Sequence, residues 1–394
     1  MAFTTIQGSG ANDATSFVGS AGVDAVNITN IDSKVFAGAQ ASADNITLTN
    51  FKALVTEYTL KGGQGTDTLT LGNVQLNTSF VNANSNNDTV TFGNATTSTV
   101  HGGQGNDTFT AGAGTSVTSG IVNGNRGNDT LALIGAQAAS AFGGRGADTI
   151  TTGGAVNQTT ISGNLDGDNI NIGAFSAAGS TINGNGGNDN ITTAATTSLG
   201  ASYFGGAGND TITGATATGT GVSLFGDVGN DTIAGSALAD AINGGVGNDT
   251  IQGNALADTL AGGGGGDRFV QGAGATAAFS VTSSGAATLA NGDAFTVAAD
   301  VISDFGTDDQ IATGVGAGAR TVGAVGTVLA AANFTIRGDY AAATGVFTTN
   351  ITGGADTLVI TGTAADFRIL ASLGTNATVL TGNGATGVTA AQFV

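Results

Sequence analysis

One short phrase recurs between Leu60 and Phe269, and it constrains the possible fold of this chain more than any other feature. The clearest copy is Ile242-Asn-Gly-Gly-Val-Gly-Asn-Asp249-Thr-Ile251. Aligned on its aspartate, the phrase occurs at Asp67, Asp88, Asp107, Asp129, Asp148, Asp168, Asp189, Asp210, Asp231, Asp249 and Asp267. The intervals of 18 to 22 residues, with a mean of 20, are typical of one coil of a solenoid and not of a helix or a hairpin.

Apolar side chains flank each aspartate at two fixed positions. Two residues after the aspartate the side chain is always apolar, from Leu69 and Val90 through to Phe269. Seven residues before it the same holds, from Leu60 and Val81 through to Leu260. The pattern predicts two columns of inward-facing side chains, one from each of two strands that flank a turn.

The turn between these columns has its own composition. The residue five positions before the aspartate is glycine in ten of the eleven copies, and Ala83 is the exception. Positions four and two before the aspartate hold only Gly, Asn or Asp. These residue types tolerate positive φ, so we expect a tightly curled backbone whose carbonyl oxygens face one spot near a carboxylate. Such an all-oxygen ligand set suits a hard cation, and Ca²⁺ suits loose geometry better than Mg²⁺ does.

Two copies are closest to a known repeat. Gly205-Gly-Ala-Gly-Asn-Asp210-Thr-Ile-Thr and Gly244-Gly-Val-Gly-Asn-Asp249-Thr-Ile-Gln resemble the nonapeptide of hemolysin-type (RTX) calcium-binding repeats. The resemblance covers residues 60 to 270 and implies a parallel β-roll, with Ca²⁺ held between the turns of neighbouring coils by aspartates and turn carbonyls. It implies that the eleven aspartates above are metal ligands, together with the turn glycines Gly62, Gly102, Gly124, Gly143, Gly163, Gly184, Gly205, Gly226, Gly244 and Gly262.

Further aspartates occur near these turns. Asp166 and Asp227 fall inside a calcium turn, so we expect them to add ligands there. RTX rolls usually have two good turns in each coil, whereas the alternate turn here is mostly degenerate. Only 235–240 and 253–258 keep a recognisable half-site, with Asp240 and Asp258 as candidate ligands. We therefore expect one well-filled row of Ca²⁺ along one edge, and an opposite edge closed mainly by packing and longer loops.

The repeat divides the chain into three parts. Residues 1–59 carry diluted copies of the phrase and are expected to form degenerate N-terminal coils and a cap, as terminal repeats of solenoids do; a small separate adhesive module is the alternative. Residues 60–270 are the calcium-binding β-roll. Residues 271–394 lose the period and alternate in short runs separated by glycine turns, which predicts a β-rich C-terminal domain. The predicted fold class is all-β, a parallel β-solenoid of about 20-residue coils.

The charge balance bears on both partners and folding. The chain has 9 basic and 28 acidic side chains and a net charge of −19, which disfavours binding to nucleic acids and anionic membranes. No window is long and apolar enough for membrane insertion. Aspartates stacked one coil apart, about 5 Å in β geometry, repel one another. One Ca²⁺ at each copy, about ten ions per chain, would cancel that charge and couple metal binding to folding.

The termini indicate a route of export. The first residues, Met1-Ala-Phe-Thr-Thr-Ile-Gln7, have neither a basic region nor an apolar core, so we expect no N-terminal signal peptide. The segments Asp300–Ile311, Asp339–Phe347 and Thr389–Val394 resemble the C-terminal regions of proteins exported by type I secretion. This resemblance implies a secreted, cell-surface location, with folding on contact with external Ca²⁺.

Catalytic motifs are missing from the sequence. The single histidine, His101, occupies a repeat position held elsewhere by Lys61, Asn123 or Phe142, which indicates an outward and permissive site. No zinc-binding helix motif, nucleophile elbow or phosphate loop is present. The close carboxylate pairs Asp166/Asp168 and Asp227/Asp231 lie inside the calcium turns, where added ligation is a simpler role than acid–base catalysis. We therefore predict that the chain is not an enzyme.

The remaining functional classes are structural. An acidic, loop-poor stack of strands with two non-repetitive ends suits an extracellular subunit that assembles with copies of itself into a surface layer or filament. A calcium-dependent adhesin or biofilm-matrix protein is the alternative, and a cell-surface polysaccharide is a further candidate partner. Outward positions beside the inward column are often Thr, as in Thr68/Thr70 and Thr108/Thr110, which leaves ice binding as a less favoured alternative. Thr also favours exposed strand positions for its own reasons.

Overall fold

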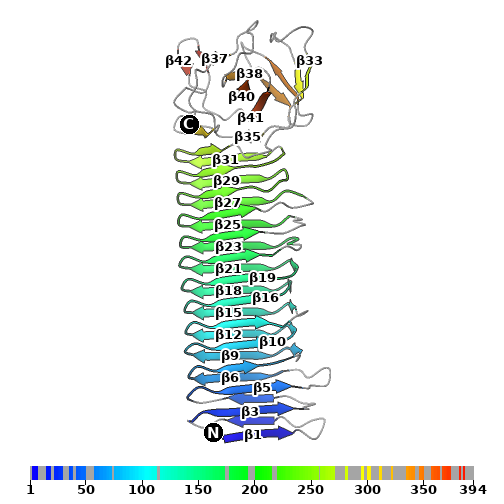
Figure 1. The fold of residues 1–394 in the computed structure, drawn as a ribbon, viewed down its shortest axis with the longest axis vertical. Coiled ribbons are helices and arrows are strands. Elements are labelled where there is room, and N and C mark those ends of the chain that lie inside the picture. Colours follow the sequence, from blue (N-terminus) through cyan, green and yellow to red (C-terminus); the bar gives the residue numbers. More distant parts are fainter. Residues whose placement is uncertain are drawn as a thin grey trace. The chain divides into compact units, whose positions relative to one another are not determined.

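The computed structural model contains two compact units, Met1–Ala207 and Gly208–Val394, and is built from strands. It describes residues 2–7, 15–18, 22–29, 35–38, 41–49, 57–72, 75–112, 116–173, 177–193, 200–214, 220–256 and 258–270, and after them separate strands between 280 and 386. The described residues include no α-helix, and thus no helix long and apolar enough to cross a membrane. The all-β parallel solenoid predicted from the repeat is confirmed (Figure 1).

Two parallel sheets build the coils of the first unit. The first sheet is formed by β1 (Ala2–Gln7), β3 (Asp24–Thr29), β5 (Asn45–Thr49), β7 (Thr68–Thr70), β10 (Thr89–Phe92), β13 (Thr108–Ala111), β16 (Thr130–Leu133), β19 (Thr149–Thr152), β22 (Asn169–Ile172) and β24 (Asn190–Thr193). The second sheet is formed by β2 (Thr15–Val18), β4 (Val35–Gly38), β6 (Thr59–Gln64), β9 (Phe80–Ser85), β12 (Thr99–Gln104), β15 (Ile121–Arg126), β18 (Ser140–Arg145), β21 (Thr160–Leu165), β23 (Thr181–Gly186) and β25 (Ser202–Ala207).

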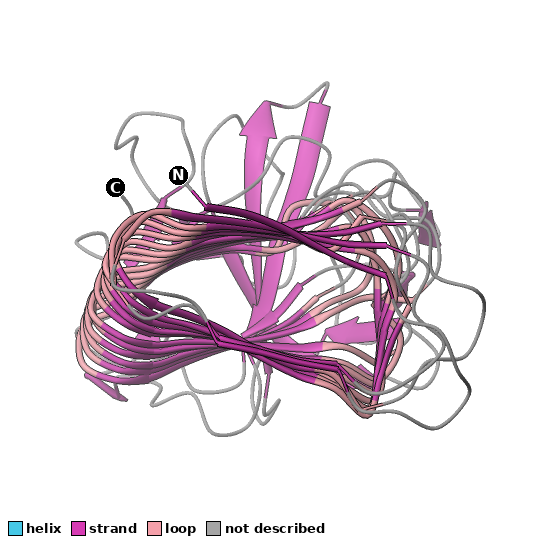
Figure 2. Ribbon diagram, turned by 90° about the horizontal axis from the view of Figure 1, so that it is seen from below, coloured by secondary structure: helices cyan, strands magenta, loops and turns pink. Residues whose placement is uncertain are grey.

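The turn that carries each repeat aspartate leads from a strand of the second sheet to a strand of the first. We call this side of the coil the glycine–aspartate edge, and the side where the chain returns to the second sheet the opposite edge. Figure 2 shows the two sheets facing one another, with stacked turns closing one edge. Each strand pairs in parallel with the equivalent strand of the next coil, as Thr68 pairs with Thr89. Equivalent residues of successive coils therefore lie side by side.

The opposite edge differs from the prediction of packing and longer loops. Between residues 76 and 157 it is closed by a third parallel ladder of two-residue strands. These strands are β8 (Leu76–Asn77), β11 (Ala95–Thr96), β14 (Val117–Thr118), β17 (Ala136–Gln137) and β20 (Val156–Asn157). The strands are too short to show period-2 alternation in the sequence, so the hydrophobic pattern gave no signal for them.

Buried hydroxyls line this opposite edge. Ser79 donates its backbone N–H to Oγ of Ser98 at 2.9 Å, and Ser98 Oγ in turn donates to the carbonyl of Thr96 at 2.9 Å. Thr159 donates its backbone N–H to Oγ of Ser180 at 3.1 Å in the same way. Each hydroxyl thus satisfies one backbone group of a neighbouring coil and is itself satisfied, so this edge is a closed hydrogen-bonded network.

The second unit continues the same kinds of coil and then changes. Its first sheet contains β26 (Thr211–Gly214), β28 (Thr232–Ala234), β30 (Thr250–Gln252), β32 (Arg268–Val270) and β36 (Gln310–Ala312). Its second sheet contains β27 (Ser223–Val228), β29 (Ala241–Val246), β31 (Thr259–Gly264) and β35 (Asp300–Ile302). The remaining strands are β33 (Ser280–Thr282), β34 (Ala294–Thr296), β37 (Thr321–Val322), β38 (Phe334–Ala341), β39 (Val346–Thr349), β40 (Asp356–Thr363), β41 (Asp366–Leu373), β42 (Thr381–Gly382) and β43 (Ala385–Thr386).

Antiparallel pairing sets these last strands apart from the coils. β38 pairs antiparallel with both β39 and β40, and β40 pairs antiparallel with β41. Hairpins need only short connections, whereas parallel coils need a full circuit of the solenoid. The secretion-like segment Thr389–Val394 lies outside the described residues.

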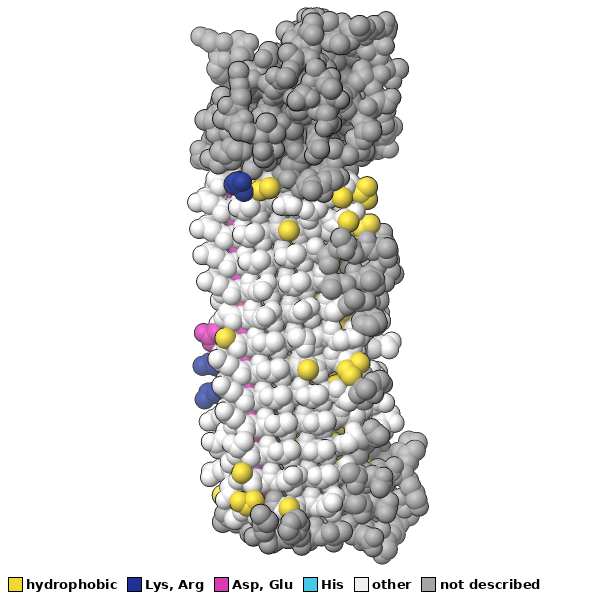
Figure 3. Space-filling view, viewed as in Figure 1, with side chains coloured by type: hydrophobic (Ala, Val, Ile, Leu, Met, Phe, Trp, Pro, Cys, Tyr) yellow, Lys and Arg dark blue, Asp and Glu magenta, His cyan; other side chains and the backbone are white. Residues whose placement is uncertain are grey.

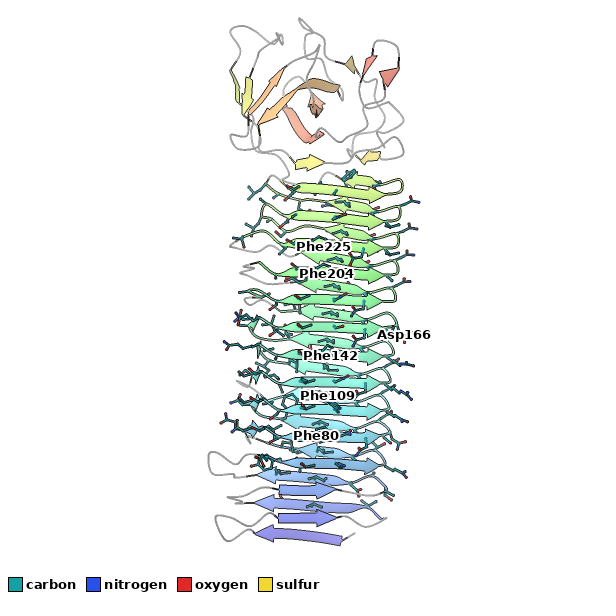
Figure 4. The ribbon with its side chains drawn as sticks, turned by 180° about the vertical axis from the view of Figure 1, so that it is seen from behind. Phe80, Phe109, Phe142, Asp166, Phe204 and Phe225 are labelled. Carbon is teal, nitrogen blue, oxygen red and sulfur yellow. The ribbon has the colours of Figure 1, made fainter. Side chains whose placement is uncertain are left out.

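The two predicted apolar columns form the core. Every residue two after a repeat aspartate is at most 3% exposed, from Leu69 at 0% to Phe269 at 3%. Every residue seven before it is equally buried, including Val100 and Tyr203 at 0% and Ile242 at 3%. Phe109 is one of the largest fully buried side chains (Figure 4). Because each coil contributes one residue to each column, the core grows with every repeat and fixes the register of the turns.

Candidate metal centre

Each turn at the glycine–aspartate edge has two residues in the left-handed backbone region. They lie four and two positions before the aspartate in all eleven copies, as for Gly103 and Gly105 at φ of 118° and 125°, or Asn84 and Asn86 at 82° and 74°. The positive φ predicted for these positions is confirmed. The glycine five before the aspartate, such as Gly102, lies outside that region. Glycine is favoured at that position because a Cβ would crowd neighbouring oxygens.

The repeat aspartates form a ladder along this edge. Asp88 donates its backbone N–H to Oδ1 of Asp107 at 2.8 Å, and Asp107 donates likewise to Oδ1 of Asp129 at 2.7 Å. The same bond, at 2.7 to 2.9 Å, links successive copies from Asp44 to Asp189 in the first unit and from Asp210 to Asp267 in the second. All eleven carboxylates are at most 3% exposed. The predicted ligands therefore line up inside the coil, one for each turn.

The second carboxylate oxygen has a different environment. Among the residues that the structure describes, Oδ2 is buried without a hydrogen-bond partner in Asp67, Asp88, Asp107, Asp129, Asp148, Asp168, Asp231 and Asp249. Oδ2 of Asp107 lies against Cα of Gly102, and a Cβ added there would also lie 2.7 Å from the carbonyl oxygen of Gly124 in the next coil. A carboxylate and a backbone carbonyl thus face one small space.

Burial makes these carboxyl groups weak acids in the absence of a cation. Burial raises the pKa of Asp88 and of Asp168 to about 8, and that of Asp129 to about 7. It raises the pKa of Asp67, Asp107, Asp148, Asp231 and Asp249 to about 6. The backbone N–H bound to Oδ1 opposes the shift but does not cancel it. A buried charge of this kind is costly unless a cation lies close to it.

The donor set fits a calcium ion. Among the described residues, no three His, Cys, Asp or Glu side chains surround one point, because each coil supplies a single inward carboxylate. An ion at this edge would take one or two carboxylate oxygens and complete its shell with turn carbonyls such as that of Gly124. Hard oxygen donors in a flexible arrangement suit Ca²⁺, which accepts six to eight such ligands.

Comparison with known protein families supports this assignment. The model of the RTX calcium-binding nonapeptide repeat (4 copies) matches residues 92–115, 139–158, 202–216, 223–251 and 235–269. The chain carries hemolysin-type RTX calcium-binding repeats. No curated protein matches it. The family supports Ca²⁺ as the bound ion, and the roles of the individual ligands named above stay predictions.

Five RTX turns lie outside the matched segments, yet they have the same geometry. They belong to Asp67, Asp88, Asp129, Asp168 and Asp189, and all five join the aspartate ladder. In four of them asparagine replaces glycine at the first left-handed position, as at Asn125, with φ of 79°. Asparagine tolerates this conformation at a low cost, so the turn survives the substitution.

A compensating residue stands two positions earlier in three of these RTX turns. Asn123 Oδ1 accepts the backbone N–H of Asn125 at 2.9 Å, and Asn82 and Asn183 do the same for Asn84 and Asn185. Sequence reasoning missed this role. The Asn-x-Asn spacing was the available signal, since asparagine side chains commonly bond to the backbone two residues on.

The two additional acidic residues of the RTX turns lie on the outside. Asp166 is exposed at the tip of its turn (Figure 4), and its Oδ2 accepts the backbone N–H of Gly146 in the preceding coil at 3.0 Å. Asp227 is exposed too, and partial burial raises its pKa. Both have positive φ, 74° and 72°. Their predicted ligation stays a prediction, and the geometry of Asp166 gives it a definite role in closing a turn.

The two half-sites at the opposite edge differ from each other. In 253–258 the left-handed residues Asn254 and Leu256 stand four and two before Asp258, as in an RTX calcium turn. In 235–240 neither position is left-handed. Ser236 instead donates its backbone N–H to Oδ2 of Asp240 and its hydroxyl to Oδ1. Asp258 therefore has the turn geometry of an ion site, whereas both oxygens of Asp240 already accept hydrogen bonds.

His101 is half-buried on the outer face of β12, where its ring packs edge-to-face against Phe80 with centroids 5.7 Å apart, and burial lowers its pKa. This contact supports a packing role for His101.

Exposed asparagines form a ladder at the turn tips, in which Asn106 and Asn128 donate backbone N–H groups to Oδ1 of Asn87 and Asn106, each at 2.8 Å. Sequence reasoning missed that ladder, although asparagine precedes most of the aspartates.

Proposed function

We propose that this RTX protein is an extracellular structural protein that folds on binding Ca²⁺ and then assembles with copies of itself into a surface layer or filament. The observation that carries the proposal is the row of buried aspartates, whose Oδ2 atoms face backbone carbonyls of the next coil. Ionised carboxylates in that position need cations. A protein with this requirement folds where Ca²⁺ is abundant, at about millimolar levels outside cells.

Export in an unfolded state follows from the same requirement. In a calcium-poor cytoplasm the buried carboxylates oppose closure of the coils, which keeps the chain competent for a type I secretion channel. Expression with and without the segment 271–394 tests this route, because the C-terminal resemblance assigns the export address to that segment. Secretion of residues 1–270 alone would contradict it.

Self-assembly is supported by the architecture of the sheets. Parallel coils end in strands whose backbone groups point along the stack, and such edges pair readily with another chain. Among the described residues, the face shown in space-filling view has few charged or hydrophobic side chains (Figure 3), which limits repulsion between copies despite the net charge of −19. The proposal assigns no catalytic role to the repeats.

Electron microscopy tests the assembly directly. Negatively stained protein in millimolar Ca²⁺ should form sheets or fibres, and chelation should dissolve them. A parallel sample in Mg²⁺ controls for simple charge screening. Discrete particles under all conditions would contradict self-assembly and favour a calcium-dependent adhesin or matrix protein that acts as a monomer.

The first sheet favours ice binding as a second candidate function. Parallel register aligns Thr68, Thr89, Thr108, Thr130 and Thr149 in one outward column, beside a column of Thr70, Thr91, Thr110, Ala132 and Thr151. Neighbouring strands lie about 4.8 Å apart, so the hydroxyls form a regular array. Thermal hysteresis measured for the calcium-loaded chain and for Thr110→Lys tests this function. Equal freezing behaviour of both proteins and a buffer blank would exclude it.

A further inference from the structure

The residue five before each repeat aspartate lines the space between two oxygens. At Gly102, an added Cβ would contact Oδ2 of Asp107 and lie 2.7 Å from the carbonyl oxygen of Gly124. At Gly124, it would contact Oδ2 of Asp129 and lie 2.6 Å from the carbonyl oxygen of Gly143. The missing side chain therefore leaves open the spot on which a carboxylate and a carbonyl converge.

A cation is the group that best resolves this convergence. Two oxygens that face each other in a buried space repel, and Ca²⁺ binds such oxygens at about 2.3 to 2.6 Å. A methyl group in the same space has the opposite effect, because it takes room from the ion and gives the carboxylate an apolar neighbour. The residue at this position thus controls access to each site.

Ala83 places such a methyl group in one coil. It is the residue five before Asp88 and is fully buried, at 0% exposed. The backbone geometry of that turn matches the others, since Asn84 and Asn86 are left-handed and Asp88 Oδ1 accepts the backbone N–H of Asp67 at 2.7 Å. The Cβ of Ala83 is therefore the feature that distinguishes this copy at the ion-facing position.

We propose that Ala83 excludes calcium from the Asp88 turn, so that the row of ions is interrupted at this coil. The inference rests on the proposed calcium-dependent function. The gap is confined to one turn, because the carbonyl of Ala83 still faces the same space as Oδ2 of Asp67, near Gly62. The coil of Asp88 is then held by its core residues, Val81 and Val90, each 0% exposed, and not by an ion.

Ion counting by native mass spectrometry, with elemental analysis of the gel-filtered protein, tests the gap. Ala83→Gly should bind one more Ca²⁺ than the unaltered chain, and Gly124→Ala should bind one fewer. Ala141→Gly is the matched control, since it removes a methyl group from a core position that is 2% exposed and belongs to the apolar column seven residues before the aspartate, not to the position five before it. Its ion count should not change. In saturating Ca²⁺, Ala83→Gly should also have a higher melting temperature than the unaltered chain.

The outcomes separate this inference from the proposed function. An unchanged ion count in Ala83→Gly, with calcium bound at the other turns, would overturn the gap and leave the calcium function intact. An unaltered chain that binds no calcium would overturn the function itself. If Gly124→Ala fails to fold, the increase in Ala83→Gly still decides the question.

Discussion

The two edges of the coil solve one structural problem with different chemistry. At both edges a buried side-chain oxygen accepts a backbone N–H from a neighbouring coil, as Asp107 does for Asp88 and Ser98 does for Ser79. The serine hydroxyl also donates, so its proton and one of its acceptor sites are both used within the edge. The carboxylate cannot donate, and its second oxygen faces another oxygen. One edge is therefore complete by itself, and the other requires a cation.

Among the changes that distinguish the two edges, calcium removal should have the largest effect on the structure of the chain. At pH 8 in chelator, the ionised carboxylates of one edge should open the coils even though the opposite edge is intact, because a solenoid coil cannot close on one side alone. Circular dichroism should show a transition from β structure to coil, and the hydrodynamic radius should increase. A chain that stays fully ordered after exhaustive dialysis against EGTA would refute the role assigned to the carboxylate edge.

Acid should partly replace calcium. The pKa of Asp168 rises from an ordinary 3.8 to about 8 on burial, so between these values the folded calcium-free chain holds more protons than the unfolded chain. Its stability therefore falls as the pH rises through this window. Circular dichroism in chelator should show more β structure at pH 5 than at pH 8. In saturating Ca²⁺ the midpoint of thermal unfolding should instead be lower at pH 5, because protons then compete with the ion.

An isosteric change separates the charge of the carboxylate from its hydrogen bond. In Asp129→Asn, the amide oxygen can still accept the backbone N–H of Asp107, and the amide nitrogen can donate to the carbonyl of Gly143, which faces the same space. One ion should be lost, while the calcium-free protein should gain stability because a buried charge is removed. Calcium titration, and the β content measured by circular dichroism in chelator, check both effects. A simultaneous loss of β content in chelator would contradict the cation requirement.

A smaller effect is expected at the opposite edge. Ser98→Ala removes the acceptor of the Ser79 N–H and leaves a buried donor unsatisfied, at a cost of about 1 to 3 kcal/mol. Urea unfolding in saturating Ca²⁺ should show this loss, and the intrinsic affinity of the calcium turns should not change. A selective loss of calcium binding would show that the two edges are coupled more strongly than their separate networks indicate.

The smallest effect is expected at the exposed asparagine ladder. In Asn106→Ala the N–H of Asn128 loses its acceptor, but water can replace it, so the cost should be about 0.5 to 1 kcal/mol. Asn106→Asp keeps an acceptor oxygen at the same place and serves as the control. Urea unfolding curves of both variants in Ca²⁺ measure the difference in the free energy of unfolding. A larger loss of stability in Asn106→Ala would mean that the hydrogen bonds at the turn tips stabilise the coils more than is expected for exposed groups.

The sequence by itself determined the period, the two inward columns and the position of the carboxylate edge. Leu69 and Val100 could be assigned to the core because their spacing from the aspartate never changes. The left-handed turn positions could be predicted as well, because Gly and Asn tolerate positive φ and few other residues do. The repeat also identified turns such as that of Asp129, which the family model does not match.

The contacts between residues of neighbouring coils could be determined only from the tertiary structure. The glycine at position 102 is required by an oxygen of Asp107 and a carbonyl from the following coil, and no local backbone preference shows that contact. The third ladder and the serine network also depend on residues about 20 positions apart. A local pattern specifies which groups each coil presents, whereas the spaces between those groups exist only after the coils have stacked.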